Sequence, residues 1–86
     1  MPEICRFYGI VIKMFFDDHD PPHFHAQYAG REALIDIRTR AVISGNLPDR
    51  ALGLVGEWVV LHRDELLSLW EKAQSLEPLH KIAPLP

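Results

Sequence analysis

The stretch FYGIVIKMFFDDHDPPHFHAQY, residues 7–28, decides the fold because two alternating segments flank a double proline. Apolar or aromatic side chains fill every even position of residues 7–17, which is the period-two pattern of a β-strand with one buried face. Residues 18–22 indicate a loop, since prolines have no amide hydrogen to donate to a sheet. Residues 23–28 alternate again. The stretch therefore predicts two strands joined as a hairpin.

The sequence after residue 28 indicates two shorter strands and one long helix. Residues 33–38 and 41–44 have strand character and are separated by a short turn. Between residues 48 and 76, apolar side chains recur at the i, i+3, i+4 spacing of one buried helical stripe, and prolines stand near both ends. A break at Arg63–Asp64, with Asp64 capping a second helix, is the alternative. Because the stripe runs through that point in phase, one helix is favoured.

The predicted fold class is α+β: an antiparallel meander of three to four strands packed on one long C-terminal helix, with an extended Pro-rich tail. A single domain is expected over residues 1–77, and residues 78–86, with three prolines, form the tail. The tail either docks along the domain or waits for a partner. A chain of 86 residues has a small core, so marginal stability alone favours a homodimer or a bound partner.

The composition narrows the class of protein. A net charge of −3 argues against nucleic-acid binding by bulk electrostatics, although Arg31, Arg38, Arg40 and Arg50 lie close together in the sequence. Cys5 is the only cysteine, so there is neither a disulfide framework nor a CxxC zinc site, as in proteins of a reducing compartment. No apolar run approaches the roughly 18 residues that span a bilayer. We expect a cytoplasmic protein without a membrane partner.

The spacing of His23 and His25 places both side chains on one face of their strand, opposite the apolar residues. They are therefore predicted to point away from the core. A four-residue turn at residues 29–32 then places His25 opposite Asp36 and His23 opposite Arg38, and the first hairpin places Asp17 opposite His23. A shift of the strand pairing by two residues would give the histidines other partners, but it would leave both of them on the face opposite the core.

Three interpretations of this face stay open. In the first, the aspartates are cross-strand ion-pair partners of the histidines on a solvated surface. In the second, His23 or His25 acts as a general acid or base beside Arg38, which stabilises a phosphate transition state as a metal-independent ribonuclease requires. In the third, the face binds a divalent transition-metal ion, because alternate histidines on one strand face can share an ion of zinc size. The candidate ligands are Asp17, His19, His23, His25 and Asp36.

The helix and the tail offer candidate contacts with a partner protein. Trp58 lies on the apolar stripe and fits a core position, or else an exposed partner-binding anchor. His62 lies on the same stripe and fits a core or interface histidine. Leu79, Ile82 and Leu85 are the large apolar residues of the tail segment. These five residues are the candidate partner interface.

Several strings in the sequence carry a family resemblance. PEICRFYGIVIKMFF followed by DHDPPHFHA, together with IDIRTR, LPDRAL and EWVVLHRDELLSLWEKA, resembles the bacterial domain-of-unknown-function family 4160 over nearly the whole chain. His19, His23 and His25 match the family pattern, but the resemblance implies no role for them. Family members often carry glycine where this sequence has Arg40, which adds charge near Arg38.

The resemblance implies an interaction role. Members are commonly small bacterial proteins without a settled activity, and their genes resemble halves of two-gene cassettes beside a second family of unknown function, number 2442. That layout is similar to a toxin–antitoxin pair. The first expectation is therefore a toxin-like interaction component whose His23, His25 and Arg38 face meets RNA or the neighbouring gene product. The alternatives are a metal-binding regulatory or hydrolytic domain centred on HFH, and a structural oligomerisation domain without catalysis. Whether the protein is an enzyme stays open.

Overall fold

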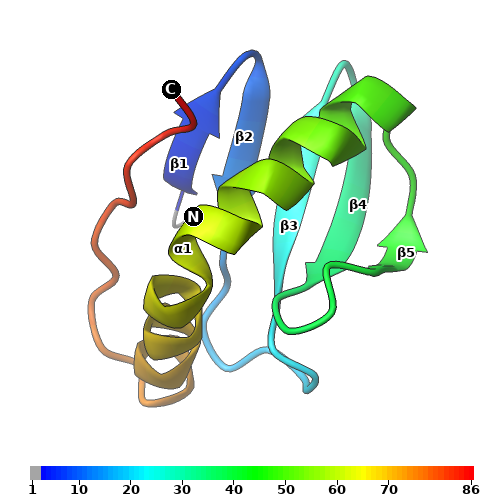
Figure 1. Ribbon diagram of the computed structural model, residues 1–86. Helices are drawn as coiled ribbons and strands as arrows, with labels where there is room; N and C mark the ends of the chain where they lie inside the picture. Colours follow the sequence, from blue (N-terminus) through cyan, green and yellow to red (C-terminus); the bar gives the residue numbers. More distant parts are fainter. Residues whose placement is uncertain (1–2) are drawn as a thin grey trace.

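The computed structural model describes residues 3–86, which contain five strands and one helix. All strands pair antiparallel with their neighbours in chain order, and the helix follows them (Figure 1). The predicted α+β fold with a long C-terminal helix is confirmed, but the sheet has five strands rather than three to four. Residues 1 and 2 of the predicted domain lie outside the described residues. The elements are β1 (Glu3–Phe7), β2 (Ile10–Lys13), β3 (His23–Tyr28), β4 (Arg31–Asp36), β5 (Val42–Gly45) and α1 (Asp49–Gln74).

The predicted single strand over residues 7–17 is wrong, because a hairpin turn divides the segment. Tyr8 and Gly9 both have positive φ, +49° and +80°, and Phe7 pairs with Ile10 across them. Such left-handed pairs make the tight two-residue turns that match the twist of a β-hairpin. β2 then ends at Lys13, four residues earlier than predicted, so the loop before β3 is longer than expected.

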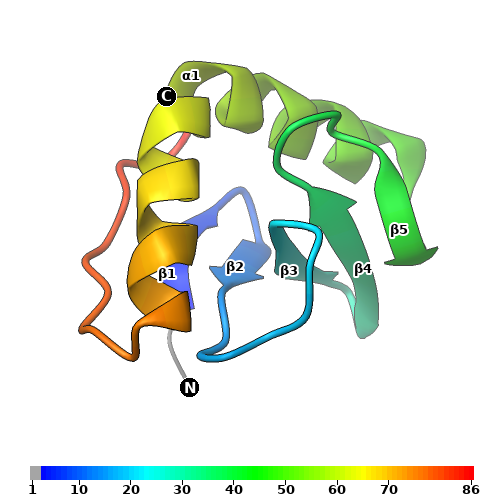
Figure 2. The same ribbon diagram turned by 90° about the horizontal axis from the view of Figure 1, so that it is seen from below.

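Helix α1 covers one face of the sheet and then bends. Its bounds agree with the predicted 48–76 to within two residues, but His62 has the non-helical angles φ −127° and ψ 17°. Figures 1 and 2 show the second half of α1 turning toward the end of the sheet where the β2–β3 loop lies. The alternative of a break near Arg63–Asp64 was thus close to the actual kink. The buried residues keep their helical spacing on both sides of the kink, and Leu61, an apolar residue of the segment 48–76, lies off that stripe and is 61% exposed.

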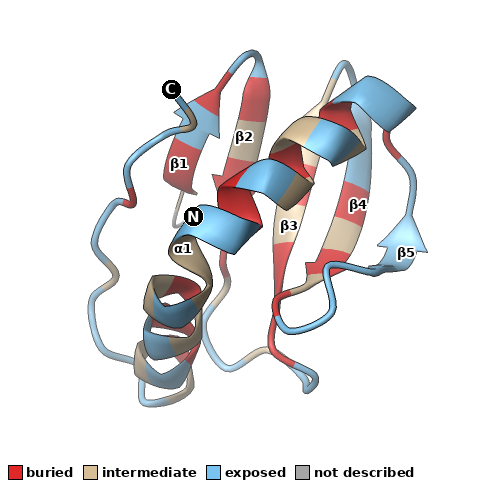
Figure 3. Ribbon diagram, in the orientation of Figure 1, coloured by how far each residue is buried: buried red, intermediate tan, exposed pale blue. Residues whose placement is uncertain are grey.

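The core lies between the sheet and α1, with Trp58 at its centre. This indole is fully buried, packs edge-on against Phe24 and lies beside Phe7. Figure 3 shows buried residues alternating along the strands and lining the sheet-facing side of α1. No helix within residues 3–86 combines the length and apolar character needed to cross a bilayer. The largest fully buried side chains are Trp58, Phe24, Ile4, Ile10, Ile12, Met14, Ile35, Ile37, Leu47, Leu66, Leu69 and Val55.

The C-terminal segment, residues 77–86, packs along β1. The backbone N–H of Ile82 donates to the carbonyl of Ile4 at 2.8 Å, and Trp58 Nε1 donates to the carbonyl of Ala83 at 2.9 Å. Trp58 is buried, which agrees with the core position and not with the alternative of an exposed anchor, and Ile82, a candidate interface residue, is buried within the chain. The other candidate interface residues, His62, Leu79 and Leu85, are partly buried.

Candidate metal centre

The loop between β2 and β3 is held against the C-terminal half of α1. The backbone N–H of Asp17 donates to the carbonyl of Ala73 at 3.1 Å, and the Gln74 amide donates to the carbonyl of Asp18 at 3.0 Å. Further along, the carbonyl of Pro22 accepts a hydrogen bond from the N–H of Ile37 at 3.0 Å. These contacts from two other elements fold the loop back over the first residues of β3.

This path brings Asp18 between the two histidines of β3. Its Oδ2 atom lies 3.1 Å from His23 Nε2 and 3.3 Å from His25 Nε2. The three residues form the one group of potential metal ligands found in residues 3–86, with ligand atoms within 4.8 Å of one another. Alternation along β3 supplies the two imidazoles on one side of the strand, and the loop supplies the carboxylate.

The prediction that both histidines point to solvent is wrong for His23, which is only 5% exposed. The Trp70 ring, from the second half of α1, lies 5.2 Å from the His23 ring, centroid to centroid. Phe15 packs edge-on against His25 at 4.5 Å. The bend in α1 and the folded-back loop therefore enclose a face that strand alternation alone assigns to solvent.

The predicted pairing of the strands was wrong by two residues. His23 faces Asp36 and His25 faces Leu34. Asp36 does not approach the histidines as a ligand, because its Oδ1 accepts the backbone N–H of Arg38 at 2.7 Å and caps the β4–β5 turn. Arg38 is exposed and forms no ion pair within residues 3–86. Neither residue belongs to the centre.

Asp17 and His19, the two loop candidates, flank Asp18, the loop residue that lies in the candidate group. Asp17 is exposed, has a left-handed backbone with φ +53°, and contacts α1 through its N–H. His19 is exposed, and its backbone N–H donates a hydrogen bond to Asp18 Oδ1 at 2.9 Å. Sequence reasoning missed Asp18. Asp18 directly follows Asp17 in the sequence. This position points to a site residue only once the loop is known to begin at residue 14.

The surroundings of His23 set a ring lone pair against an acceptor when the ring is neutral and Asp18 is ionised. Nδ1 lies 2.8 Å from the carbonyl oxygen of Pro21, which can only accept, so Nδ1 must carry the hydrogen. In a neutral ring the Nε2 lone pair then faces the Asp18 carboxylate at 3.1 Å. Moving the hydrogen to Nε2 instead sets the Nδ1 lone pair against Pro21. Each neutral form thus contains a repulsive contact, which a second proton or a metal ion removes.

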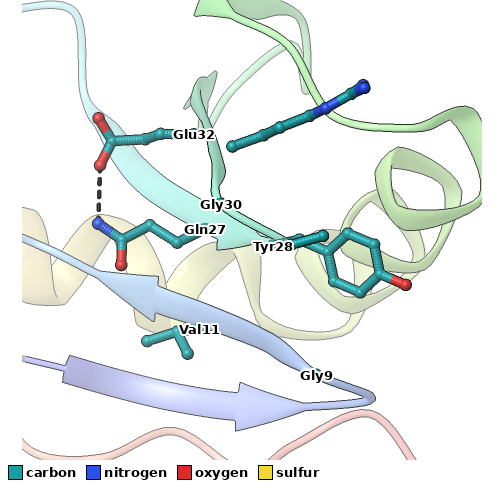
Figure 4. Close-up of a pocket in the computed structure, with 8 residues that line it drawn as sticks. Gly9, Val11, Gln27, Tyr28, Gly30 and Glu32 are labelled. Carbon is teal, nitrogen blue, oxygen red and sulfur yellow. Dashed lines mark hydrogen bonds between the residues drawn. The ribbon is translucent and has the colours of Figure 1, made fainter.

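His25 has a carboxylate near its far ring nitrogen, but beyond hydrogen-bond distance. Its Nδ1 lies 3.5 Å from Glu32 Oε2, and that oxygen also accepts a 2.9 Å hydrogen bond from the Gln27 amide (Figure 4). In metal sites, histidine ligands typically donate the far ring N–H to a carbonyl or carboxylate, which fixes the ring and its tautomer. Pro21 is placed for this role behind His23, whereas His25 Nδ1 has no hydrogen-bond partner in residues 3–86. Nε2 of each ring is left facing Asp18.

The charge state of Asp18 suits a cation ligand. Burial is the largest single effect and raises its pKa, but the hydrogen bonds from the His19 N–H and His25, with the charges of His23 and His25, together outweigh it. The pKa of Asp18 therefore lies below the usual 3.8, and the carboxylate is ionised at neutral pH.

Two imidazole nitrogens and one carboxylate oxygen are a common ligand set for zinc and other divalent transition metals. Ligand atoms about 2.0–2.1 Å from a tetrahedral ion lie about 3.3–3.4 Å from each other. The observed Oδ2–Nε2 separations of 3.1 and 3.3 Å are close to that spacing, so Asp18 and either histidine need little movement to share an ion.

Comparison with known proteins assigns the chain to a family. Residues 9–71 match the family described as Domain of unknown function (DUF4160). The chain belongs to this family. The matched region of this DUF4160 protein includes all three residues of the centre, Asp18, His23 and His25. No curated protein and no solved structure matches the chain.

Proposed function

We propose that this DUF4160 domain binds a divalent transition-metal ion through Asp18, His23 and His25. The observation that carries the proposal is the His23 ring, whose Nε2 is buried without a hydrogen-bond partner in residues 3–86 and lies 3.1 Å from a carboxylate oxygen. A buried polar atom without a partner is costly, and an ion between Nε2 and Asp18 satisfies both groups at once.

The number of protein ligands sets what the ion can do. Structural zinc sites are usually closed by four protein ligands, whereas catalytic sites use three and keep one position for water or substrate. The DUF4160 centre supplies three from within one chain. The fourth position is available for water, which supports hydrolysis, or for a donor from another molecule, which supports metal-dependent regulation.

Calorimetric titration with Zn²⁺ tests the proposal. The adjacent residues Asp18 and Asp17 provide a test variant and its matched control. We expect one site per chain in the parent protein. Asp18→Asn should weaken binding at least about tenfold, the scale of losing even a supporting group of a metal site. Asp17→Asn should leave affinity unchanged, because Asp17 lies outside the ligand group.

The competing explanation is a doubly protonated His23 paired with ionised Asp18. It predicts no saturable binding of Zn²⁺, Ni²⁺, Co²⁺ or Mn²⁺ by the parent protein and no difference between the two asparagine variants. That result would overturn the metal proposal.

The toxin-like role in a two-gene module, in the cytoplasm and with RNA or the family 2442 protein as partner, stays a prediction from the family resemblance. The same holds for homodimerisation and for a purely structural domain.

A further inference from the structure

The two halves of α1 contact different parts of the chain. The first half, residues 49–61, lies over the sheet and buries Trp58, whose ring packs against Phe24 and Phe7. The second half, residues 63–74, begins after the non-helical backbone of His62 and lies beside the loop between β2 and β3 (Figures 1 and 2). The kink at His62 is therefore a boundary between two contact regions of one helix.

The second half of α1 is tied to the loop through its last turn. The carbonyl oxygen of Ala73 accepts the N–H of Asp17 at 3.1 Å, and the side-chain amide of Gln74 donates to the carbonyl oxygen of Asp18 at 3.0 Å. The second of these hydrogen bonds is partly buried. Asp18 thus joins two elements, because its side chain faces the histidines of β3 and its main chain is held by α1.

Trp70 provides a second connection between this half of α1 and the candidate metal centre. Its residue is 4% exposed, and its ring lies 5.2 Å from the His23 ring, centroid to centroid. Leu66 and Leu69, which precede it in the same half, are fully buried. The second half of α1 therefore contacts both the loop ligand and one strand ligand of the centre through a buried apolar face.

The beginning of the C-terminal segment is attached to the same half of α1. The backbone N–H of Glu77 donates to the carbonyl oxygen of Lys72 at 2.9 Å. Further along, His80 Nε2 lies 2.9 Å from Glu65 Oε2. Residues 63–80 are thus connected to one another by their own contacts, beginning after the bend in α1.

We infer that the metal centre regulates the second half of α1: a bound ion fastens residues 63–80 to the sheet, and loss of the ion loosens them. The inference rests on the proposed metal site. An ion that holds the Asp18 side chain also fixes the loop whose main chain binds Ala73 and Gln74, so the ion and the docked helix stabilise each other. Such coupling is reciprocal, and a change that loosens this half of α1 weakens metal binding.

The regulation has a consequence at the surface. Loosening of residues 63–80 uncovers the apolar face that Leu66, Leu69 and Trp70 now bury. Exposed apolar patches are sites of interaction with other molecules. The state of the metal centre thereby controls which surface this DUF4160 domain presents.

Amide hydrogen exchange of the full chain, without metal and with saturating Zn²⁺, tests the coupling directly. Exchange reports local opening residue by residue. In the metal-free protein, residues 66–74 should exchange faster than β2 and β3, because they open without unfolding of the sheet. Zinc should slow exchange in residues 66–74 at least about fivefold, the lower end of typical coupling between sites. This measurement needs no substitution.

Gln74→Met tests the same contact from the helix. Methionine has a similar length but no hydrogen to donate, so calorimetric titration should show zinc binding at least about fivefold weaker than in the parent. Ser68→Ala, at an exposed position of the same half, should leave the affinity unchanged. If Gln74 only stabilised the fold, Gln74→Met would lower the melting temperature, but the protein that circular dichroism shows to be folded would bind zinc as the parent does.

Three results would overturn the coupling and leave the metal site in place. Residues 66–74 would exchange no faster than the sheet, or zinc would not slow them, or Gln74→Met would bind zinc as tightly as the parent. If the parent binds no zinc at all, the proposed function fails, and the coupling fails with it.

Discussion

If Asp18, His23 and His25 bind zinc as proposed, zinc should stabilise the folded chain, because these three residues meet only when it is folded. Asp18 comes from a loop held by Ala73 and Gln74 of α1, and the histidines come from β3. A ligand that binds only the folded state adds about 2.7 kcal/mol when its free concentration is 100 times the dissociation constant. For a domain of this size, 1 kcal/mol shifts the melting temperature by about 4–8 °C, so we expect a rise of about 10–20 °C.

Differential scanning calorimetry of the metal-free protein, with and without zinc, measures this rise. Asp18→Asn should lose most of it, and Asp17→Asn should keep it, since the two side chains differ in position and not in chemistry. The reasoning is refuted if saturating zinc leaves the melting temperature of the parent unchanged, or if both variants respond as the parent does. A shift that EDTA does not reverse would also count against a bound ion.

Three further predictions concern the apo protein. Because the pKa of Asp18 is lowered on folding, the ionised carboxylate stabilises the fold fully above about pH 4, and this stabilisation is lost as the pH falls through the folded pKa. Urea unfolding between pH 2 and 6 should therefore show that Asp18→Asn loses less stability in acid than the parent does. Trp58→Phe removes the indole hydrogen bond to the C-terminal segment and buried ring volume, so urea unfolding should show a loss of about 1–3 kcal/mol. Gly45→Ala should destabilise the protein by more than about 2 kcal/mol, because φ is +77° and the added Cβ meets the Glu32 carbonyl. Gly30→Ala, at φ +78° with nothing within 4 Å of the added Cβ, should cost about 1–2 kcal/mol. Equal losses of stability in thermal unfolding would contradict this difference.

The sequence predicts β3 and α1 closely because each has a single periodic pattern with one buried face, whereas β4 begins and ends two residues before the predicted 33–38. The division between β1 and β2 was missed although a signal exists. Phe7 and Ile10 are both buried although one position is odd and the other even, and this change of parity falls at Tyr8 and Gly9. A two-residue hairpin produces such a change, whereas a continuous strand does not.

The candidate site was predicted in part. The histidines of β3 were identified from their spacing, but the third ligand depends on where β2 ends and on hydrogen bonds from α1 to the loop. His23 is buried beside Trp70, which comes from the part of α1 that follows the bend at His62. Both features arise from contacts between distant segments, and periodicity within one segment contains no information about them.

The most direct test of the metal centre is a crystal grown with zinc and measured on both sides of the zinc absorption edge. We expect one anomalous peak about 2.0–2.2 Å from Asp18 Oδ2, His23 Nε2 and His25 Nε2. Absence of a peak at these three atoms, with His23 still hydrogen-bonded to Pro21 and paired with Asp18, would show that a proton supplies the positive charge and would contradict the account.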